Sequence, residues 1–136
     1  KAKIRKLKVL IVEDDKLSET LLTGYVRSFS KEILIARDGI EAVTIWQQNP
    51  DIDLVLMDIQ MPKMNGYNAT RQIRQFNKEV IIIAQTAFAL SGDYEKALNA
   101  GCNDYISKPI NKNKLTGIII NCLKDKGITG STRAHK

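Results

Sequence analysis

Short apolar runs alternate with amphipathic segments from residue 8 to residue 124, and this alternation limits the fold more than any other feature of the chain. The runs are rich in β-branched residues and have the length of buried strands. We predict strands over 8–13, 32–36, 53–58, 80–85 and 103–108. Five such strands, each followed by a helical segment, favour an α/β domain with a doubly wound parallel sheet covered on both faces.

A helical spacing of apolar side chains follows each predicted strand. We predict helices over 17–29, 66–76, 91–100 and 111–124, and one that ends at Asn49–Pro50. Two apolar faces are expected from this spacing: Leu17, Leu21, Leu22, Tyr25 and Phe29 in the first helix, and Ile40, Val43, Ile45 and Trp46 in the second. In the third helix we expect Ile73 and Phe76 to point inward.

The fourth helix has typical boundary residues. Ser91 and Asp93 stand near its predicted start, and Gly101 stands just past its end. A polar residue can cap the free N–H groups at a helix start, and glycine readily adopts the conformation that ends a helix.

The length of 136 residues suits one domain with a real core. Hydrophobic residues make up 43% and charged residues 26%, which is typical of a soluble globular protein. We expect no membrane insertion of this segment and no secretory signal, because no apolar stretch is long enough for a span. Cys102 and Cys122 are too few for a disulfide framework or a zinc site, and buried, reduced thiols in the cytoplasm are the simplest interpretation.

The net charge of +6 comes from the two ends of the chain. Residues 1–8 carry five positive charges and no acid, and residues 124–136 carry four positive charges and one negative charge. Between them, 12 Lys and Arg face 14 Asp and Glu. Because the basic residues form no helical stripe, we expect solvated termini and no direct DNA binding.

Polar side chains stand where the predicted strands stop. Glu13 and Asp14 end the first strand, Asp58 the third, Gln85 and Thr86 the fourth, and Lys108 and Pro109 the fifth. In open α/β sheets the ligand site lies outside the carboxyl ends of the strands. The sequence therefore predicts that three carboxylates, a hydroxyl and an ammonium group share one edge of the sheet.

This set of groups suits a phosphoryl site. Three nearby carboxylates repel one another, and a hard cation such as Mg²⁺ would relieve that repulsion. Lys108 would balance a phosphate, and Thr86 would donate a hydrogen bond to it. One carboxylate could then act as the nucleophile in phosphoryl transfer.

Each of these residues also has an ordinary structural interpretation. An acid after a strand is common in turns, and proline suits the first turn of a helix. We interpret Asp38, Asp51, Asp53 and Asp104 in this way, as cap and turn residues. Only the combination of four strand ends in order favours a functional site.

Four stretches resemble the receiver domain of two-component response regulators. They are VLIVEDD at 9–15, LVLMDIQMPKMNG at 54–66, IIAQTA at 82–87 and GCNDYISKPI at 101–110. The wording is most similar to the receiver of hybrid sensor histidine kinases. The resemblance covers about residues 7–124, leaving 1–6 as a basic N-terminal segment or linker and 125–136 as a tail that we expect to be disordered. It implies a flavodoxin-like sheet of five strands in the order 2-1-3-4-5, with five helices.

The resemblance implies a role for each strand-end residue. Asp58 would be the phosphoacceptor. Mg²⁺ would be held by Glu13, Asp14, Asp58 and the backbone carbonyl of Gln60.

The remaining implied roles concern switching. Thr86 would close on the phosphoryl oxygen and Lys108 would pair with the phosphoryl group. The Lys108–Pro109 bond would be cis, and Tyr105 would be the aromatic switch residue.

The family also implies partners and location. A histidine kinase or histidine phosphotransfer domain would supply the phosphoryl group, and a homodimer could form through the face of the fourth helix, fifth strand and fifth helix. The location would be cytoplasmic, including the cytoplasmic part of a membrane-bound sensor kinase. The chain would be a switch and phosphotransfer module more than a turnover enzyme, either within a hybrid kinase or as a stand-alone response regulator.

Some positions depart from the family pattern or leave its timing open. Asp15 replaces a frequent asparagine and would either add local negative charge or point to solvent. Gln85 is polar where the strand is usually apolar or small. Gln60 and Phe88 occupy positions that tune phosphoryl lifetime, and their identities do not predict that lifetime.

Rival functions on similar folds fit the sequence less well. A flavin-binding module would need a Ser-, Thr- or Gly-rich phosphate loop where this chain has EDDK. A phosphohydrolase of the haloacid dehalogenase group would need a second acid at Gln60. A dinucleotide site would need a glycine-rich turn after the first strand.

Overall fold

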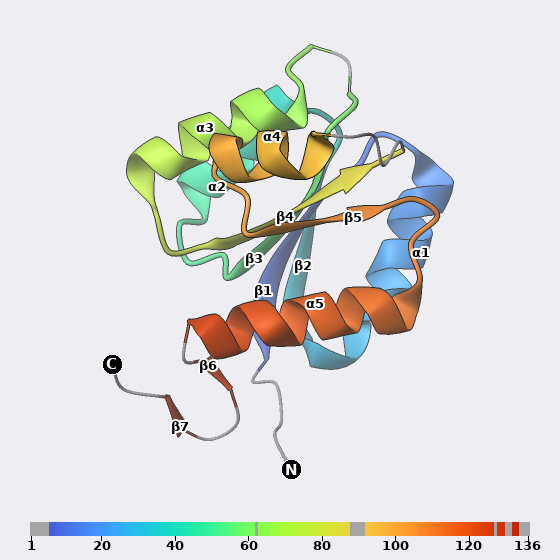
Figure 1. Cartoon of the computed structure of the whole chain (residues 1–136), viewed down its shortest axis with the longest axis vertical. Coiled ribbons are helices and arrows are strands. Elements are labelled where there is room, and N and C mark those ends of the chain that lie inside the picture. Colours follow the sequence, from blue (N-terminus) through green and yellow to red (C-terminus); the bar gives the residue numbers. More distant parts are fainter. Residues whose placement is uncertain (1–5, 62, 88–91, 127, 130–131, 134–136) are drawn as a thin grey trace.

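The computed structural model describes residues 6–61, 63–87, 92–126, 128–129 and 132–133. Its main sheet is parallel and has the strand order β2-β1-β3-β4-β5 (Figure 1). The strands are β1 Leu7–Val12, β2 Ser30–Ala36, β3 Leu54–Asp58, β4 Ile81–Thr86 and β5 Asp104–Ser107. The α-helices are α1 Lys16–Val26, α2 Gly39–Gln48, α3 Gly66–Phe76, α4 Asp93–Ala100 and α5 Lys112–Asp125. The predicted doubly wound sheet, its order and its five helices are confirmed.

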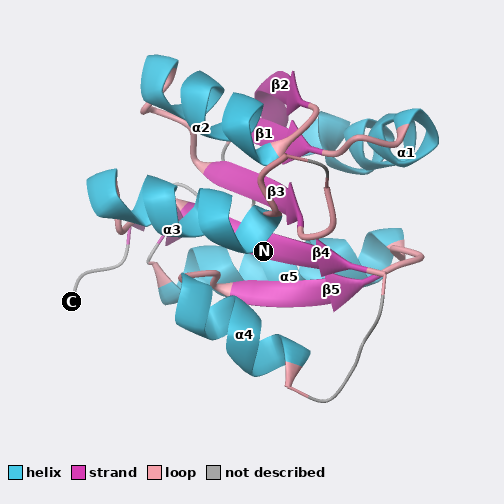
Figure 2. Cartoon of the chain, turned by 90° about the horizontal axis from the view of Figure 1, so that it is seen from above, coloured by secondary structure: helices cyan, strands magenta, loops and turns pink. Residues whose placement is uncertain are grey.

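Helices cover both faces of the sheet. Figure 2 shows α1 and α5 on one face and α2, α3 and α4 on the other. Along β1, Val9 and Ile11 belong to the core under α1 and α5, whereas Leu10 and Val12 belong to the core under the other three helices. This alternation explains why the strand is apolar throughout, since neither face meets water.

Side-chain caps fix where four of the helices begin. In each, an oxygen of the residue before the helix accepts the backbone N–H three residues on; the capping residues are Asp15, Asp38, Asn65 and Asn111. The predicted cap role of Asp38 is confirmed. Asp15 is exposed and accepts from Ser18 N at 2.9 Å, so it starts α1 and is not a further acid of the site.

The first helix is shorter than predicted. α1 ends at Val26, and Arg27–Phe29 form a turn of 3-10 helix that leads into β2, which begins two residues before the predicted strand. Leu17 is 68% exposed and Leu21 is 48% exposed, whereas Leu22 and Phe29 are buried. The sheet covers only part of the apolar face that the helical spacing defined.

The inward position predicted for Phe76 is wrong. Its side chain is 62% exposed, while Ile73 is fully buried as predicted. Phe76 is the last residue of α3, and its ring stacks on Trp46 of α2 with centroids 6.1 Å apart. It therefore covers a neighbouring helix instead of entering the core.

The other boundary predictions hold to within two residues. Asn49 caps the end of α2, and Gly101 ends α4 with a positive φ of 114°. Ser91 and Phe88 lie outside the described residues, as do residues 1–5. Cys102 and Cys122 are buried and unbridged, as predicted.

Beyond α5, residues 128–129 and 132–133 pair as two short antiparallel strands, β6 Ile128–Thr129 and β7 Thr132–Arg133. The sequence predicted no regular structure for this segment. Among the helices of the described ranges, none has the length and apolar character needed to cross a membrane.

Candidate functional site

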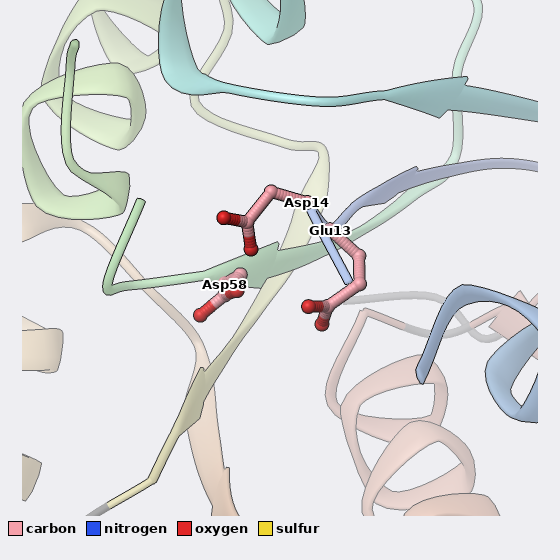
Figure 3. Close-up of side chains that lie close together, drawn as sticks. All are labelled: Glu13, Asp14 and Asp58. Atoms are coloured by element: carbon pink, nitrogen blue, oxygen red, sulfur yellow. The ribbon is translucent and has the colours of Figure 1, made fainter. Parts of the chain in front are cut away.

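Three carboxylates meet at the carboxyl ends of β1 and β3. Glu13 and Asp14 follow β1, and Asp58 is the last residue of β3. Figure 3 shows the three side chains converging, and one oxygen from each lies within 4.8 Å of the others. The parallel pairing of β1 with β3 causes this meeting, because both strands end at the same edge. The sequence-predicted acidic cluster is therefore present.

The three acids differ in their contact with water. Glu13 is fully buried and Asp58 is 3% exposed, whereas Asp14 is exposed. A buried carboxylate needs partners, and the backbone supplies two. The Asp15 N–H donates to Glu13 at 3.2 Å, and the Gln60 N–H donates to Asp58 at 3.1 Å.

Lys108 joins the acids from the other side. Its Nζ lies 3.1 Å from an oxygen of Glu13 and 3.5 Å from an oxygen of Asp58. Its backbone N–H donates to the Thr86 carbonyl at 2.7 Å, which ties the end of β4 to this lysine. The Lys108–Pro109 bond that follows is cis, as predicted.

Burial and mutual repulsion change the proton affinities of the cluster. Burial, with a further contribution from the charge of Asp58, raises the pKa of Glu13 to about 7 despite the opposing effect of Lys108. Burial also raises the pKa of Asp58. For Lys108, burial is the largest single effect and lowers the pKa, but the charges of Asp58 and Glu13 and its hydrogen bonds outweigh it and raise the pKa overall.

The chemistry of these donors fits Mg²⁺. The cluster offers carboxylate oxygens and neither imidazole nor thiolate, which favours a hard cation. The raised pKa values of Glu13 and Asp58 show that the carboxylates are short of positive charge despite Lys108. A divalent cation near Glu13, Asp14 and Asp58 would supply that charge.

Two predicted switch residues lie at the same edge or next to it. Thr86 is buried at the end of β4, beside Ser107 in the β4–β5 pairing. Tyr105 is half-buried on β5, and its ring lies against Tyr94 of α4 with centroids 5.5 Å apart. Gln60 is exposed, two residues beyond Asp58.

Gly66 is a site residue to which the sequence gave no role. A Cβ atom at this position would lie 2.3 Å from the carbonyl oxygen of Asp58. Only glycine allows α3 to begin so close to the backbone of the third strand end. The available signal was a glycine at the first position of a helix, directly after the cap residue Asn65.

Comparison with known proteins agrees with this geometry. Residues 9–120 match the family model for the response regulator receiver domain. The osmolarity two-component system protein SSK1 of Saccharomyces cerevisiae is 34% identical over 134 residues, an alignment that covers 78% of this chain and 19% of SSK1. The chain thus spans about a fifth of the length of that relative.

Two solved structures are similar in both fold and sequence. The Ssk1 receiver domain, crystallised with the yeast histidine phosphotransfer protein Ypd1, superposes with a TM-score of 0.81 at 36% identity, covering 89% of this chain and 92% of that one. The receiver domain of a Pseudomonas aeruginosa sensor histidine kinase, with a magnesium ion coordinated in its active-site cleft, has a TM-score of 0.78 at 37% identity and covers 88% and 98%. On its fold, its strand-end acids and these matches, the chain belongs to the response regulator receiver domain family.

Proposed function

We propose that Asp58 accepts a phosphoryl group from a phosphohistidine, with Mg²⁺ bound beside it, and that the domain changes conformation as a result. One observation carries this proposal: a buried carboxylate at a strand end lies among two further acids and a lysine ammonium. A phosphorelay receiver needs such a site, because phosphoryl transfer depends on positioning and charge neutralisation.

In the transfer step, an oxygen of the Asp58 carboxylate attacks phosphorus while the bond from phosphorus to the histidine nitrogen breaks. The imidazole leaves with the electron pair, and an acyl phosphate remains on Asp58. Water later hydrolyses this acyl phosphate and restores the carboxylate. Lys108, 3.5 Å from Asp58, is placed to pair with the added phosphoryl oxygens.

Glu13, Asp14, Asp58 and the backbone carbonyl of Gln60 are the groups that would hold Mg²⁺. When bound, the ion neutralises the negative charge that carboxylates and phosphoryl oxygens bring together. The coordinated magnesium ion in the related Pseudomonas receiver supports this assignment. The Gln60 N–H already bonds Asp58, which keeps the segment after β3 close to the site.

Switching is assigned to Thr86 and Tyr105. The Thr86 hydroxyl would donate to a phosphoryl oxygen, and Tyr105 would move inward as Thr86 does. Tyr105 packs partly against the core and partly against Tyr94, so its ring has two environments to exchange. Such an exchange would bias the surface formed by α4, β5 and α5 between two states.

The proposed partner is a histidine kinase or a histidine phosphotransfer protein, and the complex of the related Ssk1 receiver with Ypd1 supports this. We place the domain in the cytoplasm, within a hybrid kinase or as a stand-alone regulator. Dimerisation through the α4–β5–α5 surface and the absence of direct DNA binding complete the proposal. A flavin-binding module is less favoured, since the loop after β1 supplies acids where a flavin phosphate would lie.

The proposal is tested with a phosphorylated histidine phosphotransfer protein such as yeast Ypd1, labelled with radioactive phosphate. Label should pass to the wild-type chain in the presence of Mg²⁺ and to Asp51→Asn, whose exposed acid pairs with Lys8 far from the site. Asp58→Asn should receive none. Equal labelling of Asp58→Asn and wild type would defeat the assignment.

A further inference from the structure

A pocket of about 180 Å³ lies between α1 and the segment that joins β5 to α5. Its walls are mostly apolar: Leu21, Leu22 and Tyr25 come from α1, and Pro109 and Ile110 come from the joining segment. For scale, an apolar protein cavity of roughly 150 Å³ holds one benzene ring. The pocket therefore suits a molecule with a single ring.

Gln85 contributes an unpaired amide to this pocket. Its side chain is 0% exposed, and neither Nε2 nor Oε1 has a hydrogen-bond partner among the described residues. Ile81 and Ile83 precede it on β4 at two-residue intervals and pack in the core under α1 and α5. Strand alternation therefore directs Gln85 to the same side, toward the pocket.

A buried amide with no partner is unfavourable and rare, so a partner from outside the chain is expected. One water molecule occupies about 30 Å³ in the liquid and would leave most of the pocket empty. A cluster of waters would face mainly apolar walls. A ligand with both an apolar body and an amide-like group satisfies the walls and Gln85 together.

We propose that this pocket binds a small neutral molecule in which an apolar ring carries a primary carboxamide or a lactam. Such a group presents an N–H donor beside a C=O acceptor and so complements both free ends of the Gln85 amide. An ionic ligand fits less well. Among the described lining residues Lys108 alone is charged, and its ammonium already bonds Glu13 and Asp58. The proposal is independent of phosphoryl transfer.

Benzamide is the probe that tests this site, with toluene as its matched apolar control. In NMR titrations of the whole chain, benzamide should shift the side-chain amide signals of Gln85 and the signals of Leu21, Tyr25 and Ile110. Gln85→Leu, which keeps a similar volume without hydrogen bonding, should weaken benzamide binding about tenfold and leave toluene binding equal or stronger. Leu98→Ala on α4 should bind benzamide as wild type does.

Two results would overturn the proposal. Benzamide might leave the Gln85 and pocket signals of the wild type unmoved up to its solubility limit, which would mean that water alone satisfies the amide. Alternatively, wild type and Gln85→Leu could bind benzamide with equal affinity, which would mean that Gln85 does not recognise the carboxamide. The wild-type titration decides the first point even if Gln85→Leu fails to fold.

Discussion

Lys108 is the basic residue that bonds both buried acids, with its Nζ 3.1 Å from Glu13 and 3.5 Å from Asp58. In this position it does two different things. It partly neutralises the acids before phosphorylation, and it is the group placed to contact the phosphoryl oxygens afterwards. It offers no lone pair to a metal ion while protonated, so metal binding and lysine pairing are separable.

We predict that Lys108→Ala keeps Mg²⁺ binding but weakens the response to phosphorylation. The carboxylate ligands remain, and without the lysine they attract a cation at least as strongly. Calorimetric Mg²⁺ titration should detect binding comparable to that of wild type, whereas beryllium fluoride should shift the Thr86 and Tyr105 NMR signals less. Lys126→Ala, which removes an ion pair to Glu79 elsewhere, serves as the control. Loss of Mg²⁺ binding alone would mean that the lysine has been misassigned.

Glu13 makes the metal-free protein sensitive to pH. Its pKa is about 7 in the folded chain and about 4.5 when unfolded, so between these values the folded state binds more protons. Raising the pH through this window therefore lowers the free energy of unfolding, by at most about 3 kcal/mol. Lys108 does not contribute there, since its pKa lies above 10.5 and its contribution is lost only at higher pH.

Because a proton on Glu13 competes with a metal ion, we predict that Mg²⁺ raises the melting temperature more at about pH 8 than at about pH 5.5. Thermal unfolding with and without Mg²⁺ at the two pH values measures the difference. Glu13→Gln should remove most of the pH dependence of the metal-free protein. An equal Mg²⁺ effect at both pH values would contradict the raised pKa.

At the scale of elements, the start of α3 is held against the end of β3. A Cβ at Gly66 would lie 2.3 Å from the Asp58 carbonyl oxygen, and the backbone there has little room to move because the Gly66 N–H also donates to Ile59 O at 3.1 Å. The acid that reacts and the helix that follows are therefore positioned by the same contact.

We predict that Gly66→Ala lowers the free energy of unfolding by about 1–3 kcal/mol, because the added methyl group forces the helix and strand apart. Gly24→Ala is the matched control: it lies inside α1 with nothing within 4 Å of the new Cβ. It should raise stability by about 0.5–1 kcal/mol. Denaturant unfolding measures both, and a stabilising Gly66→Ala would show that the contact is looser than described.

At the scale of the whole molecule, the alternation of strands and helices was predictable because a parallel sheet is buried on both faces. Each strand then has to be apolar along its length, and Leu10 and Ile11 point to opposite cores for this reason. The same rule placed Asp58 and Lys108 at one edge, since parallel strands all end on the same side.

Helical spacing was less informative, because it defines a wide apolar face and not the part that a sheet covers. Leu17 and Phe76 were predicted on apolar faces and are exposed. The missing partner of Gln85 and the close approach at Gly66 were not predictable either, since both depend on distances between segments far apart in the chain.

The most direct test of the account is the intact mass of the chain after incubation with acetyl phosphate and beryllium-free buffer, with and without Mg²⁺, beside Asp58→Asn. The account predicts a gain of one phosphoryl group that requires both Mg²⁺ and Asp58. A gain in Asp58→Asn, or in wild type after complete removal of Mg²⁺, would contradict it. So would the absence of any gain in wild type together with the absence of Mg²⁺ binding, because the strand-end acids would then be structural only.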